Sequence, residues 1–306
     1  MNMSLKTPHT GFEGIELYGE LRQHEPMARH TSWRVGGVAD RYYRPASITD
    51  LGRFMGVLPE DESLYWLGLG SNLLVRDGGV RGTIIATSPG LDGMDYLGEG
   101  RLRVEAGVAS AKVARRSVAQ GLSGVEFLAG IPGSFGGALA MNAGAFGGET
   151  WQHVAAVEMM DRQGQIHSYN AAEFSVGYRS VQGPVGQWFV AGVLQLDKGP
   201  DKKGQGLIKS LLSQRGQSQP IGLANAGSVF RNPPGDYAAR LIETAGLKGR
   251  CEGAACVSDV HANFIINSGG ASAAQIEMLI QFLQLEVQRV HGVQLETEVH
   301  IVGEAS

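Results

Sequence analysis

The segment Ala129–Gly148 contains the residues whose types and spacing are best suited to binding a ligand. Its sequence, A-G-I-P-G-S-F-G-G-A-L-A-M-N-A-G-A-F-G-G, together with Gly124 just upstream, contains eight glycines and no charged side chain. Interleaved apolar residues such as Phe135 and Leu139 argue against a disordered linker. We expect a tight loop whose bare N–H groups face an anion such as a pyrophosphate. Turns inside a buried β region are the alternative.

A second glycine turn, Gly68–Asn72, lies inside the apolar segment Leu64–Val75. Its G-L-G triplet is similar to a dinucleotide fingerprint, but the third glycine is missing and the chain turns again at Asp77 before a helix could form. This excludes a Rossmann turn, which needs a helix directly after the glycines. We expect a strand–turn–strand loop whose amides, with Ser71 and Asn72, hold phosphate, and two glycine loops that converge on one ligand.

Three further side chains are candidates for chemistry. Arg179 follows a glycine and a tyrosine in G-Y-R-S, although a surface arginine is the simpler interpretation. Ser228 lies in Asn225–Pro234, where two prolines and a glycine fix a backbone that can hold a hydroxyl toward a site. Alternation in the C-terminal strand places Glu298 on one face with Glu296 and His300, a face that by default is solvated.

Composition excludes several classes of function. The chain has 306 residues, 43% of them apolar, and a formal net charge of −4, so it lacks the basic surface of a nucleic-acid-binding protein. It has neither a signal-peptide core nor an apolar run long enough to cross a bilayer, so we expect a cytoplasmic protein with no membrane insertion. We also expect a monomer. Cys251, Cys256 and His261 lack zinc-site spacing; we expect no metal, no disulfide framework, and cysteines that fill the core.

Hydrophobic periodicity predicts strands interspersed with helices, which indicates an α+β fold. We expect Ser110 to cap one helix and Asp236 another, and the longest helix to carry an apolar stripe ending at Val290. The charged, glycine-rich segment Pro200–Gly206 is the best linker, so we place a domain boundary there. The expected helices are 47–57, 110–120, 207–215, 237–245 and 272–291; the expected strands are 41–44, 64–67, 73–75, 83–87, 102–106, 153–161, 164–169, 188–196, 262–267 and 295–303.

Five separated motifs together resemble the UDP-N-acetylenolpyruvoylglucosamine reductase family, flavoenzymes of bacterial peptidoglycan precursor synthesis. They are A-G-I-P-G-S-F-G-G with M-N-A-G-A, then G-S-N-L-L-V, G-Y-R-S, A-G-S-V-F-R-N-P and L-E-T-E-V-H-I-V-G. The resemblance runs from Thr31 to Gly303 and favours the branch that lacks a longer tyrosine-bearing substrate loop. It implies a vanillyl-alcohol-oxidase-type (PCMH-type) FAD-binding domain in two lobes, residues 1–86 and 87–204. A smaller α+β substrate-binding domain, residues 205–306, would follow.

The resemblance also implies a role for individual residues. Arg179, Ser228 and Glu298 match the catalytic positions, and Tyr178, Arg179, Asn232 and His261 match substrate contacts. The chain departs from the family at Val176 and Gly177, where basic residues are frequent, and at Thr297, which replaces a frequent proline. The implied cofactor-binding residues are Gly68, Gly70, Ser71, Asn72, Gly130, Ile131, Pro132, Gly133, Ser134, Gly136, Gly137, Asn142 and Ala143.

The implied reaction reduces UDP-N-acetyl-3-O-(1-carboxyvinyl)glucosamine to UDP-N-acetylmuramate, with FAD as cofactor and NADPH as reductant. Arg179 would stabilise the negative charge that develops beside the substrate carboxylate. Glu298 would polarise that carboxylate, which requires it to be protonated or hydrogen-bonded, and Ser228 would give a proton to C2. An oxidase that returns electrons to oxygen, or a catalytically silent nucleotide-binding protein, are the alternatives.

Overall fold

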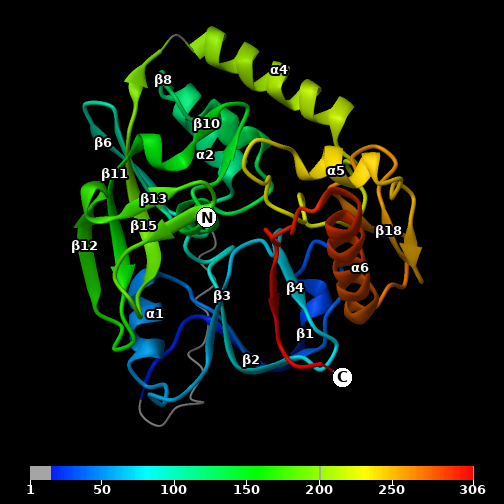
Figure 1. Ribbon diagram of the computed structural model, residues 1–306. Helices are drawn as coiled ribbons and strands as arrows, with labels where there is room; N and C mark the ends of the chain where they lie inside the picture. The colour runs from blue at the N-terminus through cyan, green and yellow to red at the C-terminus, as the bar shows by residue number, and fades with distance from the viewer. Residues whose placement is uncertain (1–14, 200, 306) are drawn as a thin grey trace. The chain divides into compact units, whose positions relative to one another are not determined.

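The computed structural model describes residues 15–199 and 201–305 of the chain (Figure 1). These residues form two compact units, each built from separate stretches of sequence. Unit 1 contains residues 15–23, 41–68 and 82–211, and unit 2 contains residues 24–40, 69–81 and 212–305. A four-stranded sheet has the strand order β1 (Glu20–Pro26), β2 (Val38–Arg44), β5 (Val80–Ala86) and β3 (Leu64–Leu67).

A five-stranded antiparallel sheet is the main layer of unit 1. The short helix α3 (Phe135–Ala140) lies on its strand β15, because Gly192 leaves room there for the side chains of Phe135 and Leu139. Both side chains are completely buried. The order of the sheet is β12 (Ile166–Asn170), β11 (Val154–Met160), β15 (Trp188–Gln195), β7 (Arg101–Glu105) and β6 (Met94–Gly98).

Helix α1 (Ile48–Met55) fills a second apolar core in unit 1. Ser47 caps it by accepting a hydrogen bond from the Asp50 N–H, and the Phe54 ring stacks on Tyr43 at 3.8 Å. The predicted helix at 47–57 is therefore confirmed, as are the strands around the Gly68–Asn72 turn, which are β3 and β4 (Leu73–Val75).

Unit 2 is organised around α6 (Ala273–His291), which packs beside the small sheet β17 (Cys251–Glu252), β18 (Ala255–Val257) and β19 (Ile265–Asn267) (Figure 1). Ser272 caps the helix through a reciprocal bond with Gln275, and Gly292, at φ 70°, ends it. Five of the predicted stripe residues are buried, but Val290 is exposed. The prediction is wrong there because the last turn of α6 extends beyond the core.

The remaining described elements connect these layers. Strand β20 (His300–Val302) runs parallel to β4 within unit 2. The other helices are α2 (Ser110–Ala119), α4 (Asp201–Ser218), α5 (Ala238–Thr244) and the 3-10 turns Met27–Arg29, Glu126–Gly130, Thr150–His153 and Ala171–Glu173; the other strands are β8 (Leu122–Ser123), β9 (Gly144–Ala145), β10 (Gly148–Glu149), β13 (Ser175–Gly177), β14 (Ser180–Gln182) and β16 (Asp197–Lys198).

The predicted linker is wrong, because residues from Asp201 onward are helical and belong to α4. The charged residues are compatible with a helix here because most of α4 is exposed to solvent. The buried side chain of Ile208 holds the helix against the rest of the protein. Gly204 also lies against Val118, where an added Cβ would come within 2.8 Å. Pro200 lies outside the described residues.

The prediction for the cysteines is also wrong. Cys251 and Cys256 form a disulfide, and Cys251 is exposed rather than part of the core. The two residues are directly paired across β17 and β18, which brings their Cα atoms to 4.1 Å. Two cysteines are too few for a framework of several disulfides. They are enough for one short disulfide across a hairpin, which the sequence analysis did not predict.

Both predicted serine and aspartate caps differ from the structure. Ala109 occupies the N-cap of α2, and Ser110 is the first helical residue, fully buried. At α5 the N-cap is Tyr237, which makes no side-chain capping bond, and the Ala238 N–H donates instead to Asn232 Oδ1 at 3.1 Å. Asp236 is instead paired with Arg240, whose hydrogen bond lowers the pKa of Asp236 to about 2.

None of the helices in the described part of the chain combines the length and apolar character needed to cross a membrane. Across residues 15–199 and 201–305, no group of three or more histidine, cysteine or acidic side chains is arranged to hold a metal ion.

Candidate active site

The two glycine segments meet in unit 1 at Gly68 and Ser134. A Cβ on Gly68 would lie 2.1 Å from Ser134 Oγ, and a Cβ on Gly136 would lie 2.7 Å from the Ala106 side chain. Such distances are shorter than real Cβ contacts, so only glycine permits this approach of backbones. Glycine is therefore required at position 68 for the two segments to lie this close together, and at position 136 for the approach to Ala106.

The glycine-rich segment Ala129–Gly148 is more regular than the predicted open loop. It contains helix α3, whose N-cap Ser134 accepts a hydrogen bond from the Gly137 N–H at 3.4 Å. The N–H groups of Phe135 and Gly136 donate to the carbonyls of Val108 and Ala106. These amides are not bare, so the glycines contribute close backbone approach and open space more than free donors.

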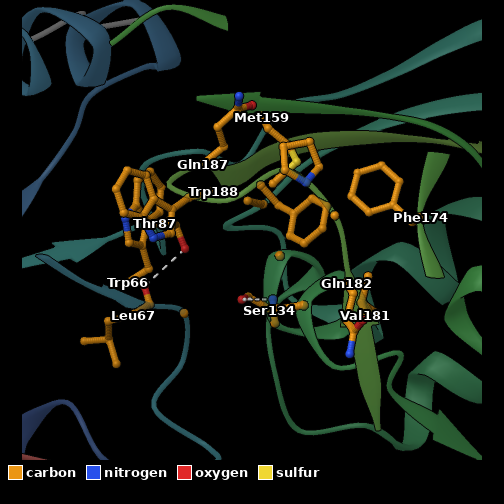
Figure 2. A pocket seen from close by; sticks show the side chains of 18 of the residues that line it. Trp66, Leu67, Thr87, Ser134, Met159, Phe174, Val181, Gln182, Gln187 and Trp188 are labelled. Carbon is orange, nitrogen blue, oxygen red and sulfur yellow. Dashed lines mark hydrogen bonds between the residues drawn. The ribbon is translucent and has the colours of Figure 1, made fainter. Parts of the chain in front are cut away.

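A cavity of about 620 Å³ in unit 1 opens beside this contact. Gly68, Ser134, Gly136 and Gly137 line the cavity, and the aromatic side chains of Trp66, Phe174, Trp188 and Phe189 are among the other residues that line it. Figure 2 shows Trp66 and Trp188 on one side of the cavity and Phe174 on the opposite side. The volume is within the range of about 300–1,000 Å³ that is usual for small-molecule sites. A glycine cradle next to an aromatic cavity fits a cofactor that joins phosphate groups to flat rings.

Arg179 lies on a two-residue turn between β13 and β14, with a φ of 52°. Its Nη2 donates to the Gly144 carbonyl at 2.9 Å and its Nη1 to the Asn142 carbonyl at 3.4 Å. The guanidinium also lies 5.1 Å from the centre of the Tyr178 ring. The predicted catalytic arginine is thus anchored to the chain that follows α3.

Asn142 strengthens this anchor from within the protein. The residue is fully buried, and its Nδ2 donates to the Gly177 carbonyl at 3.2 Å and to Glu149 at 3.0 Å. Its Oδ1 accepts from the Trp151 N–H at 3.1 Å. Sequence reasoning assigned Asn142 to the cofactor loop and gave no role to Glu149, because these bonds depend on folding rather than on a motif.

The segments that carry Ser228 and Glu298 are joined in unit 2. The Glu298 N–H donates to the carbonyl of Val229, the neighbour of Ser228, at 2.8 Å. Asn72 Nδ2 donates to the Glu298 carbonyl at 3.0 Å, which adds the end of the Gly68–Asn72 turn to the cluster. Ser228 and Glu298 are both half-buried. Three motifs far apart in sequence therefore form one hydrogen-bonded group.

Asn263 is a residue of this cluster that sequence reasoning missed. It is almost completely buried and clamps the chain after Ser228. Its Oδ1 accepts from the Phe230 N–H at 2.9 Å, its Nδ2 donates to the Phe230 carbonyl at 2.8 Å, and its own carbonyl accepts from the Val229 N–H. The only signal in the sequence is an asparagine within the apolar segment H-A-N-F-I-I.

His261 lies two residues before this clamp, and its Nδ1 accepts a hydrogen bond from the Asn263 N–H at 3.3 Å. Its ring makes an edge contact with that of Phe264, with centres 4.7 Å apart and an angle of 64° between the ring planes. Burial, and to a smaller extent the charge of Lys248, lowers the pKa of His261, while its own backbone and Glu243 oppose the shift.

The lowered pKa of His261 predicts how stability depends on pH. The unfolded chain binds a proton near pH 6.5, whereas the folded chain does so only at lower pH, so acidification below about pH 6.5 favours unfolding. We expect His261→Asn to lose less stability than the parent between pH 7 and pH 5.5, measured by urea unfolding. His24→Asn, a change of an exposed histidine, is the control. Parallel pH profiles for parent and His261→Asn would contradict the prediction.

The close approach of Gly68 to Ser134 gives a second prediction. Gly68→Ala forces a Cβ toward Ser134 Oγ, and relieving such a clash costs about 1–3 kcal/mol. We expect FAD to bind the variant about tenfold or more weakly, measured by titration of the apoprotein. Gly206→Ala is the control, because a Cβ there meets nothing within 4 Å. Equal FAD affinity in the two variants would rule out a role for the contact.

Comparison with known proteins identifies the family. Residues 39–170 match the FAD-binding domain family, and residues 219–302 match the C-terminal domain of UDP-N-acetylenolpyruvoylglucosamine reductase. The chain is 61% identical to the reductase of that name from Alkalilimnicola ehrlichii, covering 94% of this chain and 96% of the relative. It is 54% identical to the Methylococcus capsulatus reductase, covering 94% of each.

A solved structure agrees with these matches. The crystal structure of the reductase from Thermus caldophilus superposes with a TM-score of 0.79 at 33% identity, covering 92% of this chain and 98% of that chain. The predicted α+β fold with a vanillyl-alcohol-oxidase-type FAD-binding domain, and FAD as the cofactor, are confirmed. The chain belongs to the UDP-N-acetylenolpyruvoylglucosamine reductase family.

Proposed function

We propose that this chain is a cytoplasmic, monomeric enzyme that uses NADPH to reduce UDP-N-acetyl-3-O-(1-carboxyvinyl)glucosamine to UDP-N-acetylmuramate. The observation that carries the proposal is the hydrogen-bonded cluster of unit 2, which joins the Ser228, Glu298 and Asn72 motifs. Relatives that are named for this reaction support the same substrate. We also propose that residues 1–86 and 87–204 hold the cofactor and that residues 205–306 hold most of the substrate.

The residues of the unit 1 cavity would hold FAD, which when bound supplies hydride transfer. Gly68, Ser134, Gly136 and Gly137 would lie along its phosphates, since they form the wall without bulky side chains. The other predicted cofactor residues in the two glycine segments, including Gly70 and Ser71, would fix the turns on either side. An added Cβ at Gly70 would lie 1.9 Å from the His30 carbonyl, so that turn also requires glycine.

Arg179 is proposed to bind the substrate carboxylate and to stabilise the charge that develops next to it. A cation held in place before the reaction stabilises the transition state without the cost of reorienting. The bonds from Arg179 to the Gly144 and Asn142 carbonyls support this, because they fix the guanidinium before substrate arrives. Tyr178, exposed beside it on the turn, would contact the substrate.

Ser228 is proposed to donate the proton of its hydroxyl to C2 of the enolpyruvyl group. A serine is a weak acid, so the transfer depends on a strongly basic carbon and on fixed geometry. The clamp of Asn263 on the next two residues supports such geometry. Glu298, joined to the same segment, would hold a proton or a hydrogen bond toward the substrate carboxylate, and Asn232 and His261 would contact the sugar nucleotide.

One anaerobic experiment tests the function. NADPH is added to the FAD-loaded protein, followed by the UDP-enolpyruvyl sugar, while flavin absorbance is recorded. We expect NADPH to bleach the flavin and the sugar to restore it with formation of UDP-N-acetylmuramate. Recovery only on admission of oxygen, with release of peroxide, would favour an oxidase. Binding of FAD without either change would favour a silent nucleotide-binding protein.

A further inference from the structure

The disulfide between Cys251 and Cys256 in unit 2 has no part in any of the roles assigned above. The two residues are directly paired across strands β17 and β18, and β17 is the edge strand of its three-stranded sheet. Cys251 is exposed and Cys256 is half-buried. A small reductant or oxidant can therefore reach this bond from solvent.

The hairpin that carries the disulfide is also held by other interactions. The Val257 N–H donates to the Arg250 carbonyl at 2.8 Å, and the Gly249 N–H donates to the Val257 carbonyl at 3.1 Å. Ala255 and Val257 are buried in the core of unit 2. The cysteines are separated by only 5 positions in sequence, and a cross-link over so short a loop restricts the unfolded chain less than one over a long loop. We therefore expect the hairpin to keep its fold when the disulfide opens.

The proposed cytoplasmic location gives this disulfide a chemical meaning. Thiol reductants keep most cytoplasmic cysteines reduced, and the disulfides that form there are usually transient, catalytic or redox-sensing. Exposed disulfides are also reduced more easily than buried structural ones. A disulfide that is exposed, and that its hairpin does not need for folding, is suited to open and close in the native protein.

The same hairpin leads to the clamp on the segment of the proposed proton donor. Directly after β18, the Ser258 N–H donates to the Phe264 carbonyl at 2.8 Å and so closes a loop. That loop contains Asn263, whose side chain holds the Phe230 backbone through two hydrogen bonds. A looser hairpin would hold this clamp less rigidly, and the clamp supports the proposed position of Ser228.

We propose that Cys251 and Cys256 are a reversible thiol–disulfide site whose redox state adjusts the substrate half-reaction. The inference rests on the proposed function, both for the cytoplasmic location and for the role of Ser228. The site would exchange with a dithiol, the class of reductant that can open a disulfide without remaining attached to the protein.

The exchange takes place in two displacements at sulfur. One thiolate of the dithiol attacks Sγ of the exposed Cys251, the disulfide breaks, and Cys256 leaves as a thiolate that takes a proton from water. The second thiolate of the dithiol then breaks the mixed disulfide and releases Cys251, which is protonated in turn. The protein gains two electrons and two protons, and the dithiol becomes a cyclic disulfide. The Gly249 carbonyl, 3.3 Å from Cys251 Sγ, is placed to accept a hydrogen bond from the new thiol.

A thiol count tests the site itself, because the chain contains only two cysteines. The FAD-loaded protein is oxidised with glutathione disulfide, reduced with dithiothreitol in the absence of denaturant, and then oxidised again. We expect both cysteines to be unreactive toward a thiol reagent after each oxidation and both to react after reduction. Thiols that appear only in urea would show a purely structural disulfide. Thiols that persist after oxidation would show that the bond does not form. Either result would overturn the proposal.

The rates of the two half-reactions test the coupling to Ser228. We expect reduction of the disulfide to slow flavin reoxidation by the enolpyruvyl substrate by about twofold to tenfold, the usual effect of one hydrogen bond. Flavin reduction by NADPH should be unchanged. The double variant Cys251→Ser, Cys256→Ser should show the slower rate with or without dithiothreitol, which controls for direct effects of the reagent on the flavin.

The outcomes separate this site from the proposed function. Equal reoxidation rates in the oxidised and reduced parent, or equal slowing of both half-reactions, would overturn the coupling. Because the parent itself is measured in both redox states, the result does not depend on the folding of the double variant. Failure of both redox states to reduce the enolpyruvyl substrate would remove the proposed function, while the thiol count would still decide whether the disulfide is reversible.

Discussion

Replacing Ser228 by alanine is expected to leave the reduction of FAD by NADPH at the parent rate and to slow reoxidation by the enolpyruvyl substrate by about 10²–10⁴-fold. The reason is that the hydroxyl is proposed to act only when C2 needs a proton, and the first half-reaction has no such step. Stopped-flow absorbance at a flavin wavelength separates the two half-reactions. The effect would be the largest of any single substitution, since no other assigned group supplies this proton.

A matched control makes the result specific. Ser268→Ala removes a serine at an exposed position of the same unit and should leave both half-reactions unchanged. The Val229 and Phe230 backbone bonds to Asn263 do not involve the Ser228 side chain, so Ser228→Ala should retain the fold. Equal slowing of both half-reactions would show that Ser228 supports binding or structure and would remove it from the protonation role.

Arg179→Met is expected to reduce the rate of the substrate half-reaction by about 10²–10³-fold, the usual cost of removing one preorganised charge-stabilising donor. FAD affinity should stay near the parent value, because the Arg179 side chain is absent from the cavity lining. Arg179→Lys should recover only part of the rate, since one ammonium cannot reproduce the paired bonds to Gly144 and Asn142.

The measurement is again by stopped flow, with FAD affinity titrated separately. Arg115→Met, on an exposed position of α2, is the control for loss of one positive charge in unit 1. A variant that loses FAD affinity and both half-reactions together would show that Arg179 holds the glycine segment rather than the substrate. Full activity of Arg179→Met would exclude the arginine from the chemistry.

Local sequence signals predicted the parts of the fold that depend on neighbouring residues. Helix α6 is readable because Ser272 and Gln275 form a capping box, apolar residues recur at helical spacing, and Gly292 ends it. Helix α4 cannot be predicted in this way, because its glycines and lysines are typical of a linker. Its helical state depends on contacts such as that of Gly204 with Val118. The Cys251–Cys256 bridge likewise depends on a strand pairing that spacing does not encode.

In the candidate site, too, some features could be predicted from local sequence and others depend on contacts between distant segments. The residues proposed to carry the chemistry, Arg179, Ser228 and Glu298, were predicted from motifs, because the proposed reaction requires side chains of those types. The anchoring bonds of two asparagines were not predicted, since Asn142 bonds to Gly177 and Asn263 to Phe230 across more than thirty residues of chain. The aromatic lining of the cavity also escaped notice, because Trp66 and Trp188 come together only in the folded sheet structure.

The discontinuous make-up of unit 2 limits how this protein can be divided or recombined. Strand β20 pairs with β4, and the Trp33 indole donates to the Ile265 carbonyl at 2.8 Å. The C-terminal third of the chain therefore needs two short N-terminal segments, residues 24–40 and 69–81, to complete unit 2. A truncated gene beginning near codon 205 would encode a polypeptide without Trp33 and Leu74, both fully buried members of its own core. Exchange of substrate modules between relatives would therefore have to move three pieces of coding sequence together.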